Sequence, residues 1–280
     1  MEKENNKLKI DVKRITSALL GFPLVVIILT FGNKYVVDIF LAIIACISMQ
    51  EYMNAISKDA KPIRWLGYIS CIFIAFIHII PQYIPEPILN NIIILAIPIL
   101  LLVLFTTIVA TNMRINFKDV SYTLFGIVYI VTCIAFIAKI RGLEHGNWLV
   151  WFAIIAAWAS DTFAYFIGKR FGKHKFSKVS PKKSIEGCIA GVIGAVIVAL
   201  IYTYAVNEIT SLNFSYIYIT IITAILSIIG QIGDFAASSI KRYVDVKDYS
   251  NLIPGHGGML DRIDSLMFLS PFAYVFLTII

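Results

Sequence analysis

Charged side chains are scarce in this sequence. Asp, Glu, Lys and Arg together make up 15% of the 280 residues, whereas hydrophobic residues make up 59%. Soluble domains carry about 25% charged residues, and the mean hydropathy of this chain is +0.83. The shortage of charge excludes an ordinary soluble protein, and we expect most of the chain to lie within a lipid bilayer.

Cysteine is also scarce, and its spacing excludes the usual cysteine metal sites. No two cysteines form a C-x-x-C pair, and none has the spacing to a histidine that zinc sites use. All four lie in or beside apolar runs, where we expect them to be small core residues. They are Cys46, Cys71, Cys133 and Cys188.

Long apolar runs are what the chain does contain. Each run is close to the roughly 20 residues that a helix needs to cross the hydrocarbon layer. The pattern predicts an all-α, polytopic integral membrane protein with about nine transmembrane helices. The first run lacks a small-residue cleavage site, which favours a retained span over a signal peptide. The predicted spans are 15–31, 35–56, 65–82, 88–111, 119–140, 148–168, 185–206, 215–240 and 264–280.

The Lys and Arg residues are unevenly distributed among the predicted loops. With nine spans and the N-terminus inside, only Lys34, Lys139 and Arg141 of the 24 Lys and Arg fall in outer segments. Cytoplasmic loops carry such an excess of cations. We therefore predict a multi-pass protein of the cell (inner) membrane with a cytoplasmic N-terminal segment, 1–14. The net charge of +7 is explained by these loops and indicates no nucleic-acid partner.

Polar residues gather in the second half of the chain. We divide it into N-terminal transmembrane helices, 15–140, and a catalytic transmembrane region, 141–280. The latter has two cytoplasmic motif loops, 169–184 and 241–263. Asp161 lies well inside an apolar run, and an acid within a membrane is a candidate functional residue that faces a cavity. A structural partner that neutralises Asp161 is the alternative.

The densest polar stretch runs from 231 to 265. Asp261 and Asp264 are three residues apart and share a face of the last predicted helix. This spacing suits Mg²⁺, which takes one or two protein carboxylates together with substrate phosphates. Pro254 and three nearby glycines end the preceding helix and allow backbone N–H groups to approach a phosphate. The cations of this stretch would neutralise phosphates; they are Lys241, Arg242, Lys247 and Arg262.

This stretch resembles the signature of the phosphatidate cytidylyltransferase (CDP-diacylglycerol synthase) family. The matching residues are Ser238-x-Ile240-Lys241-Arg242, Lys247-Asp248-x-Ser250 and Ile253-Pro254-x-His256-Gly257-Gly258-Met259-x-Asp261-Arg262-Ile263-Asp264. Two further stretches are similar to the family, Ser160-Asp161-Thr162-x-Ala164-Tyr165 and Ser180-Pro181-Lys182-Lys183-Ser184-x-Glu186-Gly187. The resemblance is strong from about 158 to 265, and upstream only the hydrophobic layout is similar.

The resemblance implies a Mg²⁺-dependent nucleotidyltransferase of phospholipid biosynthesis. It would make CDP-diacylglycerol and pyrophosphate from CTP and phosphatidic acid, and a second cation stays open. The expected metal ligands are Asp234, Asp261 and Asp264, and the expected catalytic residues are these three with Lys241, Arg242 and Arg262. The expected substrate-binding residues are Asp161, Tyr165, Ser180, Lys182, Lys183, Glu186, Ser238, Lys247, His256, Gly257 and Gly258.

Several alternatives stay open. A CTP-dependent kinase of a polyprenol or phytol would need similar carboxylates and cations, but it would release CDP instead of pyrophosphate. An ion-coupled carrier would also place acids within the membrane, although carriers more often show corresponding interrupted spans in both halves. Glu51 ends the second predicted span, where a helix-end, packing or catalytic role fits. Membrane lipids are expected neighbours, and a homodimer is left open.

Overall fold

The computed structural model describes residues 19, 21–177, 180, 183–210 and 212–279, and this part of the chain is helical without a named strand. The prediction of an all-α fold is confirmed. The predicted N-terminal segment, 1–14, the start of the first span and Lys182 lie outside the described residues.

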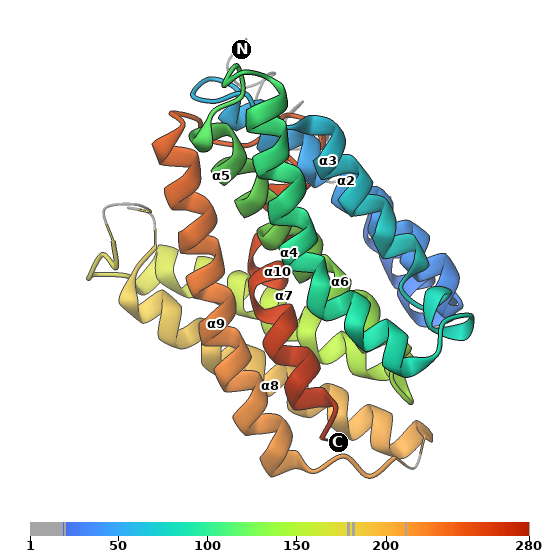
Figure 1. Cartoon of the computed structure of the whole chain (residues 1–280). Coiled ribbons are helices and arrows are strands. Elements are labelled where there is room, and N and C mark those ends of the chain that lie inside the picture. The colour runs from blue at the N-terminus through green and yellow to red at the C-terminus, as the bar shows by residue number, and fades with distance from the viewer. Residues whose placement is uncertain (1–18, 20, 178–179, 181–182, 211, 280) are drawn as a thin grey trace.

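The helices follow one another along the chain, most of them with short connections (Figure 1). A first apolar helix covers Gly21–Phe31. The α-helices that follow it are α2 (Lys34–Ile56), α3 (Arg64–Ile72), α4 (Glu86–Ala110), α5 (Phe117–Gly126), α6 (Cys133–Gly142), α7 (Gly146–Phe171), α8 (Ile185–Thr210), α9 (Tyr216–Tyr243) and α10 (Leu260–Leu277). Two 3₁₀ turns, η1 (Phe73–Phe76) and η2 (Ile80–Gln82), follow α3, and a π turn, η3 (Ile127–Thr132), joins α5 to α6.

Six helical segments of the described chain are long and apolar enough to cross a membrane. They are α2, α4, the continuous α5–η3–α6 segment, α7, α8 and α9. The protein is therefore a membrane protein. Gly21–Phe31 and Arg64–Phe76 are shorter apolar helices, and α10 contains Asp261, Arg262 and Asp264 within its first turns. The count of about nine spans stays a prediction.

The third predicted span, 65–82, is wrong as a single helix. The α-helix ends at Ile72, and 3₁₀ turns replace it. Pro81 stands in the first turn of η2, and a proline there cannot donate the backbone hydrogen bond that a continuing helix needs. His78 Nδ1 lies 2.8 Å from a carboxylate oxygen of the fully buried Asp38. This pair joins the irregular segment to α2.

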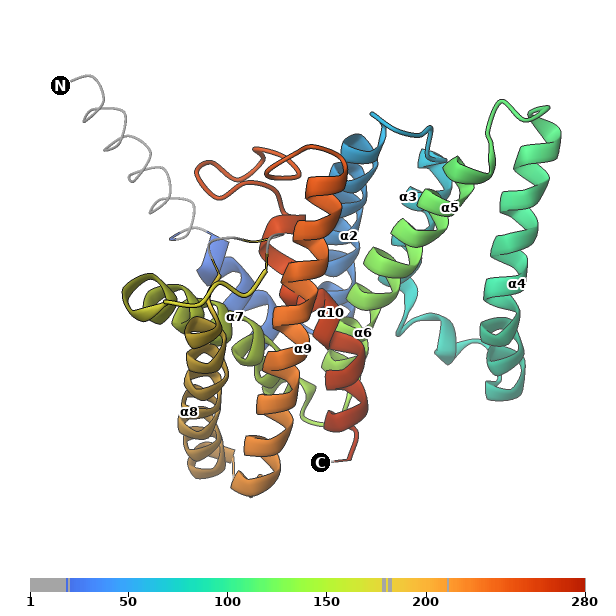
Figure 2. The ribbon, with the colours of Figure 1, turned by 90° about the vertical axis from the view of Figure 1, so that its left-hand side faces the viewer.

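The helices of the second half of the chain pack closely against one another. α7 packs against α8, and α9 packs against α10 and α8, whereas α6 packs against α10, α2 and α7. Gly233 permits the close approach of α9 and α10, because a Cβ atom there would meet the side chain of Phe268. Figure 2 shows α4 standing apart from this bundle, and Leu104 is its one buried residue.

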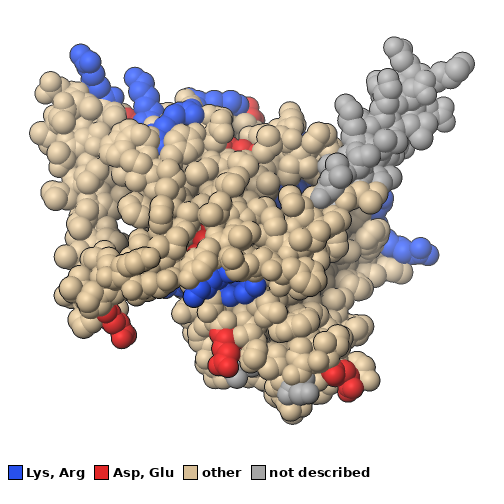
Figure 3. Space-filling model, turned by 90° about the vertical axis from the view of Figure 1, so that its right-hand side faces the viewer, with Lys and Arg blue, Asp and Glu red and all other residues tan. Residues whose placement is uncertain are grey.

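Three connections lie at one end of the bundle. They are 57–63, 111–116 and 244–259 (Figure 2). Figure 3 shows Lys and Arg side chains along the upper edge of one face, and a further basic patch lower on that face. The long polar connection between α9 and α10 therefore lies at the same end of the bundle as the loops that hold Lys58, Lys61 and Arg114.

Candidate active site

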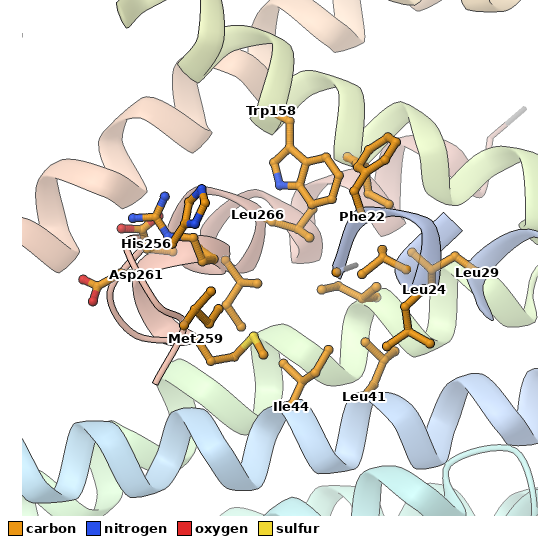
Figure 4. Close-up of a pocket in the computed structure, with 18 of the residues that line it drawn as sticks. Phe22, Leu24, Leu29, Leu41, Ile44, Trp158, His256, Met259, Asp261 and Leu266 are labelled. Carbon is orange, nitrogen blue, oxygen red and sulfur yellow. The ribbon is translucent and has the colours of Figure 1, made fainter. Parts of the chain in front are cut away.

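A cavity of about 450 Å³ lies between the first helix, α2, α6, α7 and α10. This volume is within the range of about 300–1,000 Å³ for small-molecule sites. Its polar end is lined by Asp161, His256, Asp261, Arg262 and Asp264. Figure 4 shows His256 and Asp261 at one end of the cavity, and Phe22, Leu24 and Leu29 at the other. The cavity therefore offers a polar end and a long hydrocarbon wall to one ligand.

Asp261 organises the connection between α9 and α10. Its Oδ1 accepts a hydrogen bond from Lys241 Nζ at 2.7 Å. Its Oδ2 accepts bonds from the backbone N–H groups of Tyr249 at 2.9 Å and Gly258 at 3.0 Å. The side chains of Lys241 and Asp261 are only 10% and 2% exposed. Both carboxylate oxygens of Asp261 thus already accept hydrogen bonds from groups of the protein itself.

The glycines of this connection are required by its backbone. Gly255 and Gly257 have φ of 79° and 89°, a region that residues with a side chain rarely adopt. The Ile253 N–H donates to the Gly257 carbonyl at 2.9 Å, and the Gly257 N–H donates to the Ile253 carbonyl at 3.1 Å. A Cβ atom at Gly257 would lie 3.2 Å from Asp261 Oδ2. The sequence-predicted glycine turn is therefore confirmed as a tight structure built against Asp261.

A second acidic group joins α7, α9 and α10. Ser265 Oγ donates to Asp161 Oδ2 at 2.8 Å, and the Ser265 N–H donates to Asp264 Oδ1 at 2.8 Å. Asp234 interacts electrostatically with both Asp161 and Asp264. Asp161 and Asp264 also line the cavity. These three residues, Asp161, Asp234 and Asp264, are called the acidic cluster below.

Lys183 is paired with the acidic cluster. It forms an ion pair with Asp234, and its ammonium group lies 4.8 Å from the centre of the Phe235 ring. Burial alone would lower the pKa of Lys183, but Asp234 and Asp161 raise it above its ordinary value. Lys183 therefore stays protonated at neutral pH. The structure thus brings one lysine of the motif loop 169–184 to the acids of α7 and α9.

The family of the chain follows from comparison over almost its whole length. The family model described as the cytidylyltransferase family matches residues 12–280. The chain belongs to the cytidylyltransferase family. This match confirms the resemblance, and it extends the resemblance beyond 158–265 to most of the N-terminal half.

Curated relatives of this cytidylyltransferase share one name. A phosphatidate cytidylyltransferase of Bacillus subtilis (strain 168) is 38% identical over 183 residues, 65% of this chain and 66% of that protein. A phosphatidate cytidylyltransferase of Staphylococcus haemolyticus (strain JCSC1435) is 31% identical over 265 residues, 94% of this chain and 98% of that protein. One of Staphylococcus aureus (strain COL) is 33% identical with the same coverage.

Several predicted site residues of the cytidylyltransferase lie away from the acidic cluster. Tyr165 is 61% exposed, and Arg242 and Lys247 are exposed at the end of the bundle. Glu186 accepts the backbone N–H groups of Lys173 at 3.1 Å and His174 at 3.2 Å, so it holds the start of the motif loop. The Ser180 carbonyl accepts the Lys183 N–H at 3.1 Å.

The carboxylates of the acidic cluster suit a hard divalent ion that is also coordinated by phosphate oxygens. Among the described residues, no group of three His, Cys, Asp or Glu side chains stands ready to enclose a metal ion. Mg²⁺ does not need such a cage, because it takes one or two carboxylates and completes its shell with water and phosphate oxygens. Asp234 and Asp264, which interact electrostatically across the acidic cluster, fit this requirement. Asp261 fits it less well because its two oxygens already accept three bonds.

Sequence reasoning missed part of the polar network. Ser265 bridges Asp161 and Asp264, and Gln231 Nε2 donates at 3.0 Å to Ser160 Oγ and at 3.0 Å to the Cys188 carbonyl. These residues are close to the motifs in sequence, and that closeness was the one feature of the sequence that could have indicated their place in the network. The sequence leaves the role of Glu51 open, and the structure places its carboxylate against the α9–α10 connection from the other half of the chain.

Proposed function

We propose that this cytidylyltransferase transfers CMP from CTP to phosphatidic acid, giving CDP-diacylglycerol and pyrophosphate. The supporting observation is the cavity, which has acids and Arg262 at one end and hydrocarbon side chains at the other. A lipid phosphate would lie at the polar end while an acyl chain follows Leu29, Leu41 and Ile44 into the apolar part. A soluble alcohol or sugar would leave that apolar wall without a partner. The names of the curated relatives support the same substrate.

The reaction needs positioning and charge neutralisation more than a nucleophilic side chain. A phosphate oxygen of the lipid attacks the α-phosphorus of CTP and forms a new P–O bond. The bond from the α-phosphorus to the bridging oxygen breaks, and its electron pair leaves with pyrophosphate. Because the attacking oxygen is already anionic, no side chain has to remove a proton. The cost lies in bringing two polyanions together, which phosphoryl-transfer enzymes meet with fixed cations.

Two cations of this chain support that role. Lys183 beside the acidic cluster and Arg262 at the cavity would neutralise phosphate oxygens. Lys241 would do so only by giving up its bond to Asp261. We propose Asp234 and Asp264, beside Asp161, as ligands of Mg²⁺, which would supply charge neutralisation between the substrates. We assign Asp261 to holding the α9–α10 connection.

The proposed topology has nine spans in a bacterial inner membrane. The N-terminus and both motif loops lie on its cytoplasmic side. The positive-inside rule supports it, and so does the gathering of 57–63, 111–116 and 244–259 at one end of the bundle (Figure 2). CTP is a cytoplasmic nucleotide, so the polar end of the cavity would open toward its substrate. A homodimer is compatible with the lipid-exposed α4, and native mass spectrometry tests it.

The activity assay measures pyrophosphate and CDP release from CTP by the purified protein in mixed micelles. We expect pyrophosphate release only when both phosphatidic acid and Mg²⁺ are present. CDP release with a polyprenol or phytol acceptor would establish the kinase alternative instead. Flux of an ion across liposomes in the absence of nucleotide would support a carrier. Absence of CTP-dependent pyrophosphate release with phosphatidic acid would refute the proposed function.

The apolar wall provides a second prediction. Ile44 lines the cavity, whereas its neighbour Ile43 is 53% exposed on the outside of α2. We expect Ile44→Trp to fill acyl-chain space and to raise KM for phosphatidic acid about tenfold or more, since overpacking costs about 1–3 kcal/mol. KM for CTP should stay unchanged. Ile43→Trp is the matched control, and equal kinetics of the two variants would contradict a lipid site in this cavity.

A further inference from the structure

Glu51 lies far from the signature in sequence but next to it in space. It belongs to α2, in the half of the chain whose resemblance rested on hydrophobic layout, and it is only 5% exposed. Charged groups in such surroundings are costly unless they are bonded. The bonds of Glu51 therefore indicate what the residue is for.

The Glu51 carboxylate accepts hydrogen bonds from the α9–α10 connection and from the first residue of α10. Its Oε1 accepts Ser250 Oγ at 2.6 Å and the Met259 N–H at 2.9 Å. Its Oε2 accepts the Leu260 N–H at 2.8 Å. One carboxylate thus ties Ser250, in the middle of the connection, to Met259 at its end and to Leu260 at the start of α10.

The two backbone donors belong to the beginning of α10. Met259 is the N-cap residue of this helix, it already has helical φ and ψ, and it makes no side-chain cap bond. The first N–H groups of a helix lack partners within the helix and favour a negative charge. Glu51 supplies that charge from another helix. It is the cap that the local sequence of α10 does not provide.

Gly258 leaves the space in which the Glu51 carboxylate lies. A Cβ atom at position 258 would lie 2.7 Å from Glu51 Oε2, closer than side-chain carbons approach. The φ of Gly258 is not in the left-handed region, which among the described glycines holds Gly255 and Gly257. Position 258 therefore requires glycine because a larger residue would collide with the Glu51 carboxylate.

The groups held by Glu51 are followed directly by the groups that face the cavity. Asp261, Arg262 and Asp264 occupy the first turns of α10, and Arg262 and Asp264 line the cavity. A rotation or fraying of the first turn of α10 would move all of them together. Misplacement by about 1 Å can cost roughly 100-fold in rate.

We infer that Glu51 is a positioning residue of the transferase, which fixes the first turn of α10 and the connection before it so that Arg262 and Asp264 meet the phosphates. The expected effect of Glu51 on the rate rests on the proposed function. The expected coupling between Glu51 and Gly258 in stability does not depend on that function.

The experiment compares the kinetics and melting temperatures of variants of the full chain in detergent. We expect Glu51→Ala to lower kcat for CMP transfer roughly 100-fold with a smaller change in the KM for CTP. Glu51→Gln should fall between Glu51→Ala and the unmodified protein, because its amide oxygen accepts one backbone N–H but its NH₂ group cannot accept the other. Glu86→Gln, which removes an exposed acid from the first turn of α4, should change neither quantity.

A double-mutant cycle provides the decisive readout. Gly258→Ala should lower the melting temperature and the rate when Glu51 is present. In the Glu51→Ala background the added methyl group has space, so Gly258→Ala should add little further loss of stability. Equal effects of Gly258→Ala in both backgrounds, or full activity of Glu51→Ala, would overturn the inference. If the unmodified protein releases no pyrophosphate while the stability coupling is found, the proposed function fails and the Glu51 contact stands.

Discussion

Asp264→Asn should lower CMP transfer by about 100-fold to 1,000-fold, the usual loss when a preorganised charge is removed from a phosphate- or oxyanion-stabilising site. Asparagine keeps the shape of the side chain, and its oxygen still accepts the Ser265 N–H that Asp264 accepts now. The change therefore removes the negative charge with little disturbance of α10. Asp234→Asn should have a loss of similar size, because Asp234 belongs to the same acidic cluster.

The same variants separate a metal-binding role from a structural one. In the unmodified protein we expect Mg²⁺ to raise the melting temperature in the presence of CTP, and we expect this rise to disappear in Asp264→Asn. Asp245→Asn is the matched control. Asp245 is an exposed acid of the same α9–α10 connection with φ of 53°, a conformation that asparagine also tolerates. Full activity of Asp264→Asn at ordinary Mg²⁺ concentration would remove the acidic cluster from the mechanism.

Asp261→Ala should abolish activity and also destabilise the protein. It leaves Lys241 charged and buried, and it removes the acceptor of the Tyr249 and Gly258 N–H groups. Removing one partner of a buried ion pair costs about 3–5 kcal/mol. We expect the melting temperature to fall and pyrophosphate release to be lost. The melting temperature is measured by tryptophan fluorescence in detergent.

A double variant shows which part of that loss is the unpaired charge. Lys241→Met in the Asp261→Ala background removes the buried ammonium group, so part of the lost stability should return while activity does not. Asp59→Asn provides an exposed comparison, since Asp59 pairs with Lys118 at the surface of the same end, where ion pairs contribute little. If the Asp261→Ala protein had the same melting temperature as the unmodified protein, this would contradict the role of Asp261 in holding the connection.

The sequence by itself determined the class of protein and the local elements of the candidate site. Its apolar runs predicted a helical membrane protein, because hydrocarbon requires every backbone group to be bonded within a helix. The spacing of Asp261 and Asp264 predicted two acids on one face of the last helix, and both are buried in the first turns of α10. The run from Gly255 to Gly258 predicted a turn, which the positive φ values bear out.

Tertiary structure alone decided which acid meets which partner. Nothing in the spacing distinguishes Asp234, which pairs with Lys183, from Asp261, which pairs with Lys241 and two backbone N–H groups. Periodicity gives the face of a helix on which a residue lies, but the neighbour on that face depends on how separate helices pack. Glu51 reaches Leu260 across 209 positions of sequence. Such a contact exists only after α2 and α10 have come together, and no local pattern in either helix encodes it.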